Sequence, residues 1–212
     1  ILIFGVSLGR SIELKGNTSY LEFLIPGLVA MSIIKNSFDN ATSSIMGQKY
    51  VNELQDLRTA PFSILQLSFS RSLASLLRGL IVGLITLFIG EIFYVVIFHA
   101  FIGIHNPISL LFFSVVGGLC FGFLGTTIGM YSKSFEHVGA ISSMVLLPLI
   151  YLGGVFFNIN NLDPFWRYLS YFNPLYYLID GIRYSFLGNG ESSILISAAT
   201  AFFFLVFVYL LS

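Results

Sequence analysis

The chain has 212 residues, of which 56% are hydrophobic and only 9% are charged, and its mean hydropathy is +0.89. A typical soluble domain carries about 25% charged residues, and a soluble fold of this composition would expose a large apolar surface. The composition therefore excludes a water-soluble protein and predicts an integral membrane protein. The formal net charge is zero, so no basic surface indicates a nucleic-acid partner.

Five apolar segments are long enough to cross a bilayer, whose ~30 Å core requires ~20 residues at helical rise. Residues 1–9 are expected to end a further, truncated helix, because the chain has no initial methionine and begins within an apolar run. We expect Pro26 and Pro107 to lie in the first turns of their helices. The predicted fold is an all-α polytopic transmembrane bundle of six spans in one domain, 1–212, with complete spans at 23–46, 79–98, 107–131, 138–157 and 192–212.

Cytoplasmic loops of membrane proteins are enriched in lysine and arginine. One side of the predicted bundle carries five basic residues and the other carries four, which favours a cytoplasmic position for the first side. Arg71 and Arg78, seven residues apart, are expected to snorkel from the cytoplasmic membrane surface. The predicted cytoplasmic side carries Lys49, Arg58, Arg71, Arg78 and Lys133, and the other side carries Arg10, Lys15, Arg167 and Arg183.

Charged residues inside the predicted spans are candidates for a substrate path. Lys35 and Asp39 are four residues apart and therefore share one helix face. Intramembrane charges usually face a bundle interior, a cavity or each other, so these two residues either line a path or simply neutralise one another. Glu91 has no partner nearby in the sequence; it is either a hydrogen-bonded structural group or a proton-coupling carboxylate.

The span 107–131 contains two small-xxx-small motifs, Gly118 to Gly122 and Gly125 to Gly129. Such motifs allow close approach between helices in a membrane, so we expect this helix to be tightly packed. The single cysteine, Cys120, excludes an internal disulfide and is expected to be a small buried hydrophobic residue.

Several enzyme motifs are missing from the sequence. It contains no GxxxxGK[ST] phosphate loop and no HExxH. The three histidines, His99, His105 and His137, do not have the spacing of metal ligands. We therefore expect no catalytic residues, no metal site and no cofactor in this chain.

The loop 47–62 is expected to form a short amphipathic helix that Pro61 ends. Apolar Tyr50, Leu54 and Leu57 have helical spacing, and charged residues cover the other face. Such a helix either lies in the membrane interface or docks a soluble partner.

Three stretches carry a likeness to a known family: FLIPGLVAMSIIKNSFDNATSSI at 23–45, NELQDLRTAPFS at 52–63, and PLIYLGGVFFNINNLDPFWRYLSYFNPLYYLIDGIRYSFLG at 148–188. In this order they resemble the ABC type-2 permeases, the membrane subunits of bacterial ABC exporters. The PGL helix start, the acidic arginine-bearing helix and the C-terminal N-P-L-x-Y and G-x-R-Y pattern are each similar to that family.

The resemblance implies a multi-pass protein of the bacterial inner membrane that pairs with a second copy and with two separate ATPase subunits, which hold ATP and magnesium. It implies a coupling helix contacting the ATPase through Glu53, Asp56 and Arg58, with Lys133 and Glu136 as a second contact. The substrate expected is lipid-linked, glycan or amphipathic and drug-like. It is exported through a path for which the candidate residues are Lys35, Asp39 and Glu91.

The aromatic stretch 158–188 is too interrupted to cross the membrane. We expect a short helix from Pro164, a break at Asn173 and Pro174, and a second amphipathic helix. Because non-helical backbone within a membrane must be covered by protein or a cavity, the best fit is an external re-entrant hairpin between the last two spans. The resemblance implies the same element, to which Trp166, Asn173 and Pro174 belong. We expect Tyr168, Tyr171 and Tyr176 to lie at the outer membrane surface.

Two alternatives from other classes remain at this point. A proton-coupled secondary transporter would use Glu91. A non-ABC membrane enzyme or scaffold would use Lys35, Asp39 and Glu91.

Overall fold

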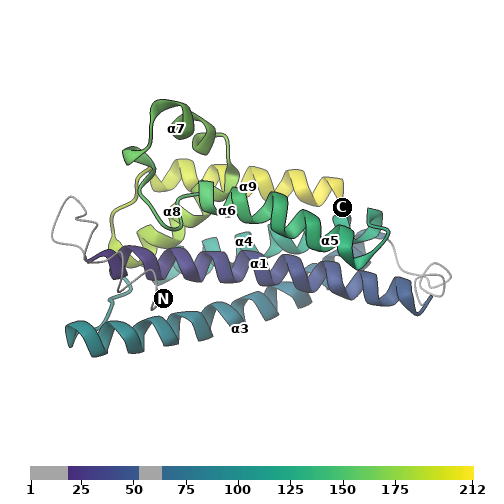
Figure 1. Ribbon diagram of the computed structural model, residues 1–212, viewed down its shortest axis with the longest axis horizontal. Helices are drawn as coiled ribbons and strands as arrows, with labels where there is room; N and C mark the ends of the chain where they lie inside the picture. The colour runs from purple at the N-terminus through teal and green to yellow at the C-terminus, as the bar shows by residue number, and fades with distance from the viewer. Residues whose placement is uncertain (1–18, 53–63) are drawn as a thin grey trace.

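The structure is a computed structural model that describes residues 19–52 and 64–212. Long helices lie side by side along the long axis, and two shorter helices gather at one end (Figure 1). The described elements are α1 (Tyr20–Tyr50), α3 (Ile64–Phe98), α4 (Pro107–Tyr131), α5 (Phe135–Ile141), the π-helical turn η2 (Ser142–Leu146), α6 (Leu147–Leu152), the 3-10 turn η3 (Ile159–Asn161), α7 (Pro164–Tyr171), α8 (Pro174–Leu187) and α9 (Ile194–Leu211).

The all-α fold class is confirmed for the residues described, which contain helices and loops but no strand. Five segments are long and apolar enough to cross a membrane: α1, α3, α4, the continuous segment from α5 to α6, and α9. The predicted truncated span at 1–9 lies outside the described residues. We call the end of the bundle that carries α7 the α7 end, and the opposite end the Lys49 end (Figure 1).

The helix α1 begins earlier than the sequence predicted, at Tyr20 instead of 23. Ser19 caps it: the Ser19 hydroxyl accepts the amide of Leu21, and the Glu22 carboxylate accepts the amide of Ser19. This reciprocal capping box satisfies amides that would otherwise have no partner. Pro26 therefore lies inside the helix, and the prediction that it opens the first turn was wrong.

The helix α3 is longer than predicted, because residues 64–78 continue the same helix as the apolar span. The prediction that Arg71 snorkels was also wrong, whereas the exposed side chain of Arg78 does not contradict it. Arg71 is buried and donates to the side chain of Gln48, while Arg78 donates to Asn40 Oδ1 at 2.7 Å. Both arginines contact α1, which gives this polar part of α3 a protein surface to pack against.

The observed bounds of the other spans match the predicted bounds to different degrees. The helix α4 has the predicted bounds, and Pro107 is in its first turn behind the capping side chain of Asn106. The segment from α5 to α6 begins at Phe135 and ends at Leu152, instead of spanning 138–157, because Gly153 and Gly154 turn the chain; Gly154 has a φ of +84°. A positive φ favours glycine there.

The glycines of α4 allow α1 and α3 to approach closely, as the small-xxx-small motifs predicted. A Cβ on Gly125 would lie 2.6 Å from the backbone oxygen of Phe38, and one on Gly122 would lie 3.0 Å from the backbone of Ser72. Helix α1 packs most extensively against α4 and α3. Cys120 is fully buried, as predicted.

The stretch 158–188 forms two helices, as the sequence predicted. α7 stands away from the bundle, whereas α8 packs against α1, α4 and α9 (Figure 1). The second of these helices was predicted as amphipathic, and most of it is buried within the bundle. Tyr168 is 68% exposed but Tyr176 is only 1% exposed, which corrects the prediction that Tyr176 lies at the membrane surface.

Candidate functional site: a polar stripe and cavity within the membrane spans

A polar stripe runs along the middle of α1, and Lys35 and Asp39 lie within it. Side chains spaced three or four residues apart share one face of a helix. The stripe consists of Ser32, Lys35, Asn36, Asp39, Asn40 and Ser43, all of which are partly or fully exposed. A helix with polar groups at membrane depth is costly to place against lipid, so this face is a candidate for a path or a protein interface.

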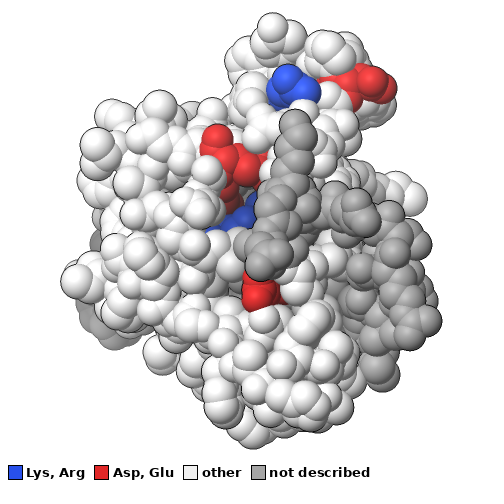
Figure 2. All heavy atoms as spheres, turned by 90° about the vertical axis from the view of Figure 1, so that its left-hand side faces the viewer, with Lys and Arg blue, Asp and Glu red and all other residues white. Residues whose placement is uncertain are grey.

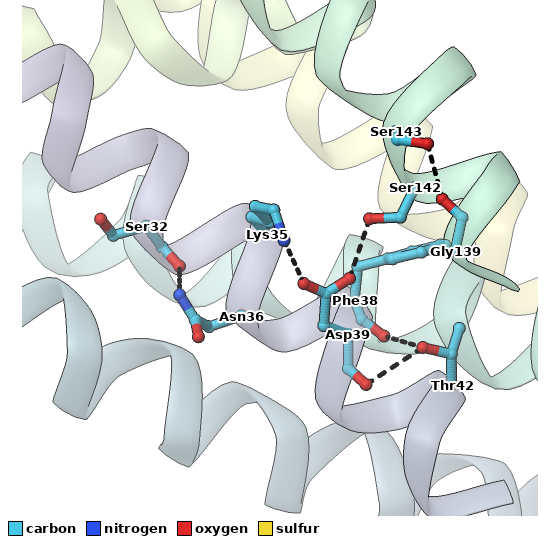
Figure 3. A network of polar contacts seen from close by, with 9 residues as sticks. All are labelled: Ser32, Lys35, Asn36, Phe38, Asp39, Thr42, Gly139, Ser142 and Ser143. Atoms are coloured by element: carbon cyan, nitrogen blue, oxygen red, sulfur yellow. Dashed lines mark hydrogen bonds and ion pairs between the residues drawn. The ribbon is translucent and has the colours of Figure 1, made fainter. Parts of the chain in front are cut away.

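Lys35 and Asp39 form an ion pair within α1 (Figure 3). The other carboxylate oxygen of Asp39 accepts a hydrogen bond from the Ser142 hydroxyl at 3.0 Å. Asp39 therefore joins α1 to η2, which is distant in the sequence. The lysine and aspartate side chains are still 35% and 39% exposed, so the pair is not sealed inside the protein.

The other edge of the stripe contacts α3. Asn40 donates to the Ser75 hydroxyl at 3.2 Å, and the Thr86 hydroxyl donates to Ser32 at 2.9 Å. The edge of the stripe with Lys35, Asp39 and Ser43 borders open space instead. A cavity of about 390 Å³ lies there, between α1 and the α5–η2 segment, and it is lined by Lys35, Asp39, Ser43, Ser142 and Ser143 among others.

Ser142 stands at the start of the π-helical turn η2. The amide of Leu147 donates to the Ser142 carbonyl, five residues back. The next residue is Pro148, which has no amide hydrogen and disfavours a regular α-helical turn before it. π-turns within helices are frequent at functional sites. Here the turn lies beside the Lys35–Asp39 pair (Figure 3) and interrupts the predicted span 138–157 at the level of the cavity.

At the Lys49 end, Lys49 caps the C-terminal end of the neighbouring helix α4. Lys49 Nζ, in the last turn of α1, donates to the carbonyls of Gly129, Met130 and Ser132. These carbonyls belong to the end of α4 and would otherwise lack helical partners. Sequence reasoning had used Lys49 only as a loop charge.

The second predicted contact for an ATPase lies beside this lysine. Lys133 and Glu136 line a cavity of about 490 Å³ together with Lys49 and Tyr50. Residues 47–50, expected in the coupling loop, belong to α1. The other predicted coupling residues, Glu53, Asp56 and Arg58, lie outside the described residues.

At the α7 end, a buried charge cluster was missed by sequence reasoning. It consists of Asp180 and Arg183 of α8 and Glu191 of the loop before α9. Arg183 pairs with Glu191 at 3.4 Å, donates to the Gly154 carbonyl at 2.7 Å and lies 3.7 Å above the Phe23 ring. Figure 2 views this end and shows few charged atoms, with acidic and basic atoms close together near the middle of the face.

Each carboxylate of this charge cluster has two donors or more. Asp180 accepts the amides of Glu191 and Ser192, at 2.8 and 3.0 Å. Glu191 accepts the amide of Ile159 at 3.1 Å in addition to Arg183. Burial raises the pKa of Glu191, and the Arg183 guanidinium opposes that rise. The cluster joins α8 to the loop before α9, to η3 and to the turn after α6.

Glu91 has a partner that the sequence did not suggest. Its carboxylate accepts the amide of Ile102 at 3.2 Å, which fixes the turn between α3 and α4 at the α7 end. It therefore lies apart from the Lys35–Asp39 pair. No group of three or more His, Cys, Asp or Glu side chains in residues 19–52 and 64–212 is arranged to hold a metal ion.

The residues singled out on the aromatic stretch have different surroundings. Trp166, Tyr168 and Tyr171 lie on α7 and are 49%, 68% and 38% exposed. Asn173 is buried; its amide group donates to the Leu149 carbonyl at 2.7 Å and accepts the amide of Leu175. Pro174 opens α8. Burial raises the pKa of the Tyr176 hydroxyl.

Comparison with known proteins identifies the family. The sequence profile of the ABC-2 type transporters matches residues 1–187. The chain belongs to the ABC-2 type transporter family. This agrees with the resemblance found in the three sequence stretches, and the family assignment accounts for a membrane bundle used in transport.

Individual relatives are similar over nearly the whole chain. The inner membrane transport permease YadH of Escherichia coli K12 is 32% identical over 210 residues, which are 99% of this chain and 80% of YadH. Nodulation protein J of Neorhizobium galegae is 25% identical over 220 residues, covering 100% of this chain and 80% of that protein. Nodulation protein J of Rhizobium leguminosarum bv. viciae is 22% identical over 214 residues, 98% of this chain and 78% of that protein.

Proposed function

We propose that this chain is the membrane subunit of an ABC exporter in the bacterial inner membrane. In this proposal two copies pair, and two separate ATPase chains bind ATP and magnesium and drive the transport. Family membership supports the proposal, together with the similarity to YadH, an inner membrane transport permease. The five apolar spans described supply the membrane part.

The observation that carries the proposal of a path is the partly open polar stripe of α1 inside a membrane span. Lys35, Asp39 and Ser142 border a cavity at that depth. Water or a polar part of a substrate satisfies such groups, whereas lipid tails do not. Glu91 fits less well as a path residue, because it holds the turn at the α7 end. A lipid-linked, glycan or amphipathic substrate would present polar groups to the stripe.

The Lys49 end is proposed to face the cytoplasm and the ATPase. It combines Lys49, Lys133 and Glu136 around one cavity, and the loop with Glu53, Asp56 and Arg58 leaves α1 at this end. The α7 end is then external, and α7 with the aromatic residues Trp166, Tyr168 and Tyr171 would lie at the outer headgroup level. In this arrangement α8 anchors the external segment inside the bundle.

Charge reversal tests the ATPase contact. We expect Glu53→Lys with Arg58→Glu to abolish co-purification of the permease with its ATPase, because a docked charged face would meet like charges. The matched control is Arg167→Glu at the α7 end, which should leave co-purification unchanged. Normal assembly and normal ATPase stimulation in the reversed variant would contradict the proposed contact.

The hydroxyl of Ser142 should matter for the transport cycle, whereas that of Ser143 should not. Ser142→Ala removes the hydrogen bond between η2 and Asp39, and a hydrogen bond to a charged group contributes about 1.5–3 kcal/mol when buried. Because Asp39 is partly exposed, we expect the ATPase activity of the assembled transporter in vesicles to change by roughly tenfold at most.

Ser143→Ala is the matched control for this effect. The Ser143 hydroxyl donates to Gly139 O at 2.8 Å, within its own helical segment. The control variant should therefore retain the wild-type activity. Equal activities of the Ser142→Ala and Ser143→Ala variants would show that the contact between η2 and Asp39 plays no part in the cycle.

A further inference from the structure

A second cavity, of about 370 Å³, lies on another side of the bundle and is almost entirely apolar. We call it the α7 groove. Residues of α4, α6 and α9 form its walls, among them Leu124, Leu149 and Phe204, and Leu169 of α7 also lines it. Its volume falls within the ~300–1,000 Å³ typical of small-molecule pockets.

The α7 groove offers nothing to water. Asn173 is its one polar lining residue, and both ends of that amide group are already used by Leu149 and Leu175. A water molecule needs two to four polar partners to occupy a cavity. The bond from Asn173 to the Leu149 carbonyl also holds the start of α8 against α6, so the groove has a fixed wall.

The α7 groove is continuous with surfaces suited to hydrocarbon. Its walls belong to α4, α6 and α9, which are parts of segments able to span a membrane. On α9, the neighbouring Phe202 and Phe203 are 54% and 70% exposed. A crevice that opens among such side chains in a bilayer is reached laterally by lipid tails, whereas water would have to cross an apolar surface to enter it.

The helix α7 indicates where the headgroup of such a lipid would be. Phe165, Trp166 and Tyr168 are exposed on it, and aromatic residues of this kind concentrate at the membrane–water interface. Arg167 supplies a cation on the same helix and donates to the carbonyl of Leu162 at 3.1 Å. Leu169 faces the groove from this helix. One short helix therefore separates a headgroup level from an apolar crevice.

We propose that the α7 groove binds one acyl chain of a phospholipid, which stays with the permease and packs α7 against α4, α6 and α9. This site is separate from the polar stripe and does not depend on what is transported. The chain fills space that apolar side chains leave open, so it should raise the stability of the α7 region by burying their surface.

Tryptophan fluorescence tests the α7 groove directly, because Trp166 is the single tryptophan of the chain. In a Trp166→Phe background, Phe204→Trp places a reporter in the groove. Phe203→Trp places the control reporter at the next position, which is 70% exposed and does not line the groove. The full-length permease in detergent is titrated with phosphatidylcholine whose acyl chains carry bromine, which quenches tryptophan on contact.

The emission of the Phe204→Trp reporter should fall and saturate near one lipid per chain, while that of the Phe203→Trp reporter falls gradually without saturating. Adding Leu169→Phe, a conservative change at a 43% exposed position, should narrow the α7 groove and weaken the saturable step. The same titration curve for both reporters would overturn the proposal. An unquenched Phe204→Trp reporter would also overturn the proposal. Disulfide cross-linking of Leu152→Cys between two copies would then show that a second copy covers the groove.

Discussion

Replacing Arg183 by methionine should lower the thermal midpoint of the purified permease by on the order of 10 °C. Arg183 is 3% exposed, and without it the buried Glu191 would lose the cation that pairs with it in the part of the chain that the structure describes, next to the buried carboxylate of Asp180. Removing one partner of a buried ion pair costs about 3–5 kcal/mol, and each 1 kcal/mol shifts the midpoint of a chain of this size by about 2–4 °C. A thermal unfolding scan in detergent measures the shift.

Two further variants separate charge from packing at Arg183. Arg167→Met removes an arginine that is partly exposed and donates to the carbonyls of Asn160 and Leu162, so its midpoint should stay near the wild-type value. Arg183→Met with Glu191→Gln also removes the uncompensated carboxylate, and it should recover part of the loss. If Arg183→Met is as stable as Arg167→Met, the charge cluster does not hold the α7 end together.

Gly125→Ala should also destabilise the protein, although alanine is the better helix former. The added Cβ would lie 2.6 Å from Phe38 O and 2.8 Å from the Cβ of Ala41, both on α1. A backbone carbonyl within a helix cannot rotate away, so the two helices must separate. Overpacking of this kind costs about 1–3 kcal/mol, and a thermal scan of the variant should show a lower midpoint.

Gly117→Ala is the matched control on the same helix. Its new Cβ would meet its nearest neighbour, Cδ2 of Leu178, at 3.7 Å, which is an ordinary contact. Because glycine in a helix is less favourable than alanine by about 1 kcal/mol, this variant should be as stable as the wild type or slightly more so. A Gly125→Ala midpoint equal to that of Gly117→Ala would contradict the close approach between α1 and α4.

The sequence predicted those parts of the fold that depend on local chemistry. Asn106 and Pro107 give α4 its start, and the glycine spacing on α4 predicted its tight packing. The start of α1 was missed although Ser19 and Glu22 have the spacing of a capping box, because Pro26 was given more weight. The polar beginning of α3 was missed for a different reason: Arg71 and Arg78 are stabilised by α1 side chains, and hydropathy along one chain does not show such partners.

The candidate site was likewise predictable from the sequence only in part. The pairing of Lys35 with Asp39 follows from a spacing of four residues and was expected as one of two possibilities. The link from Asp39 to Ser142 joins residues 103 positions apart, and the cluster around Arg183 depends on Glu191 and on a backbone carbonyl of Gly154. Such contacts arise from how helices pack together, and neither periodicity nor composition contains that information.

The hydrogen bonds from Lys49 to the end of α4 have a mechanical consequence. One ammonium group ties the last turn of α1 to three carbonyls of α4, so the final turn of α1 cannot fray without releasing them. A pull exerted on the chain beyond residue 52 therefore acts on two helices at once. Because Lys49 links the two helices close to residue 52, α1 and α4 should move together as one rigid unit when this end of the protein is displaced.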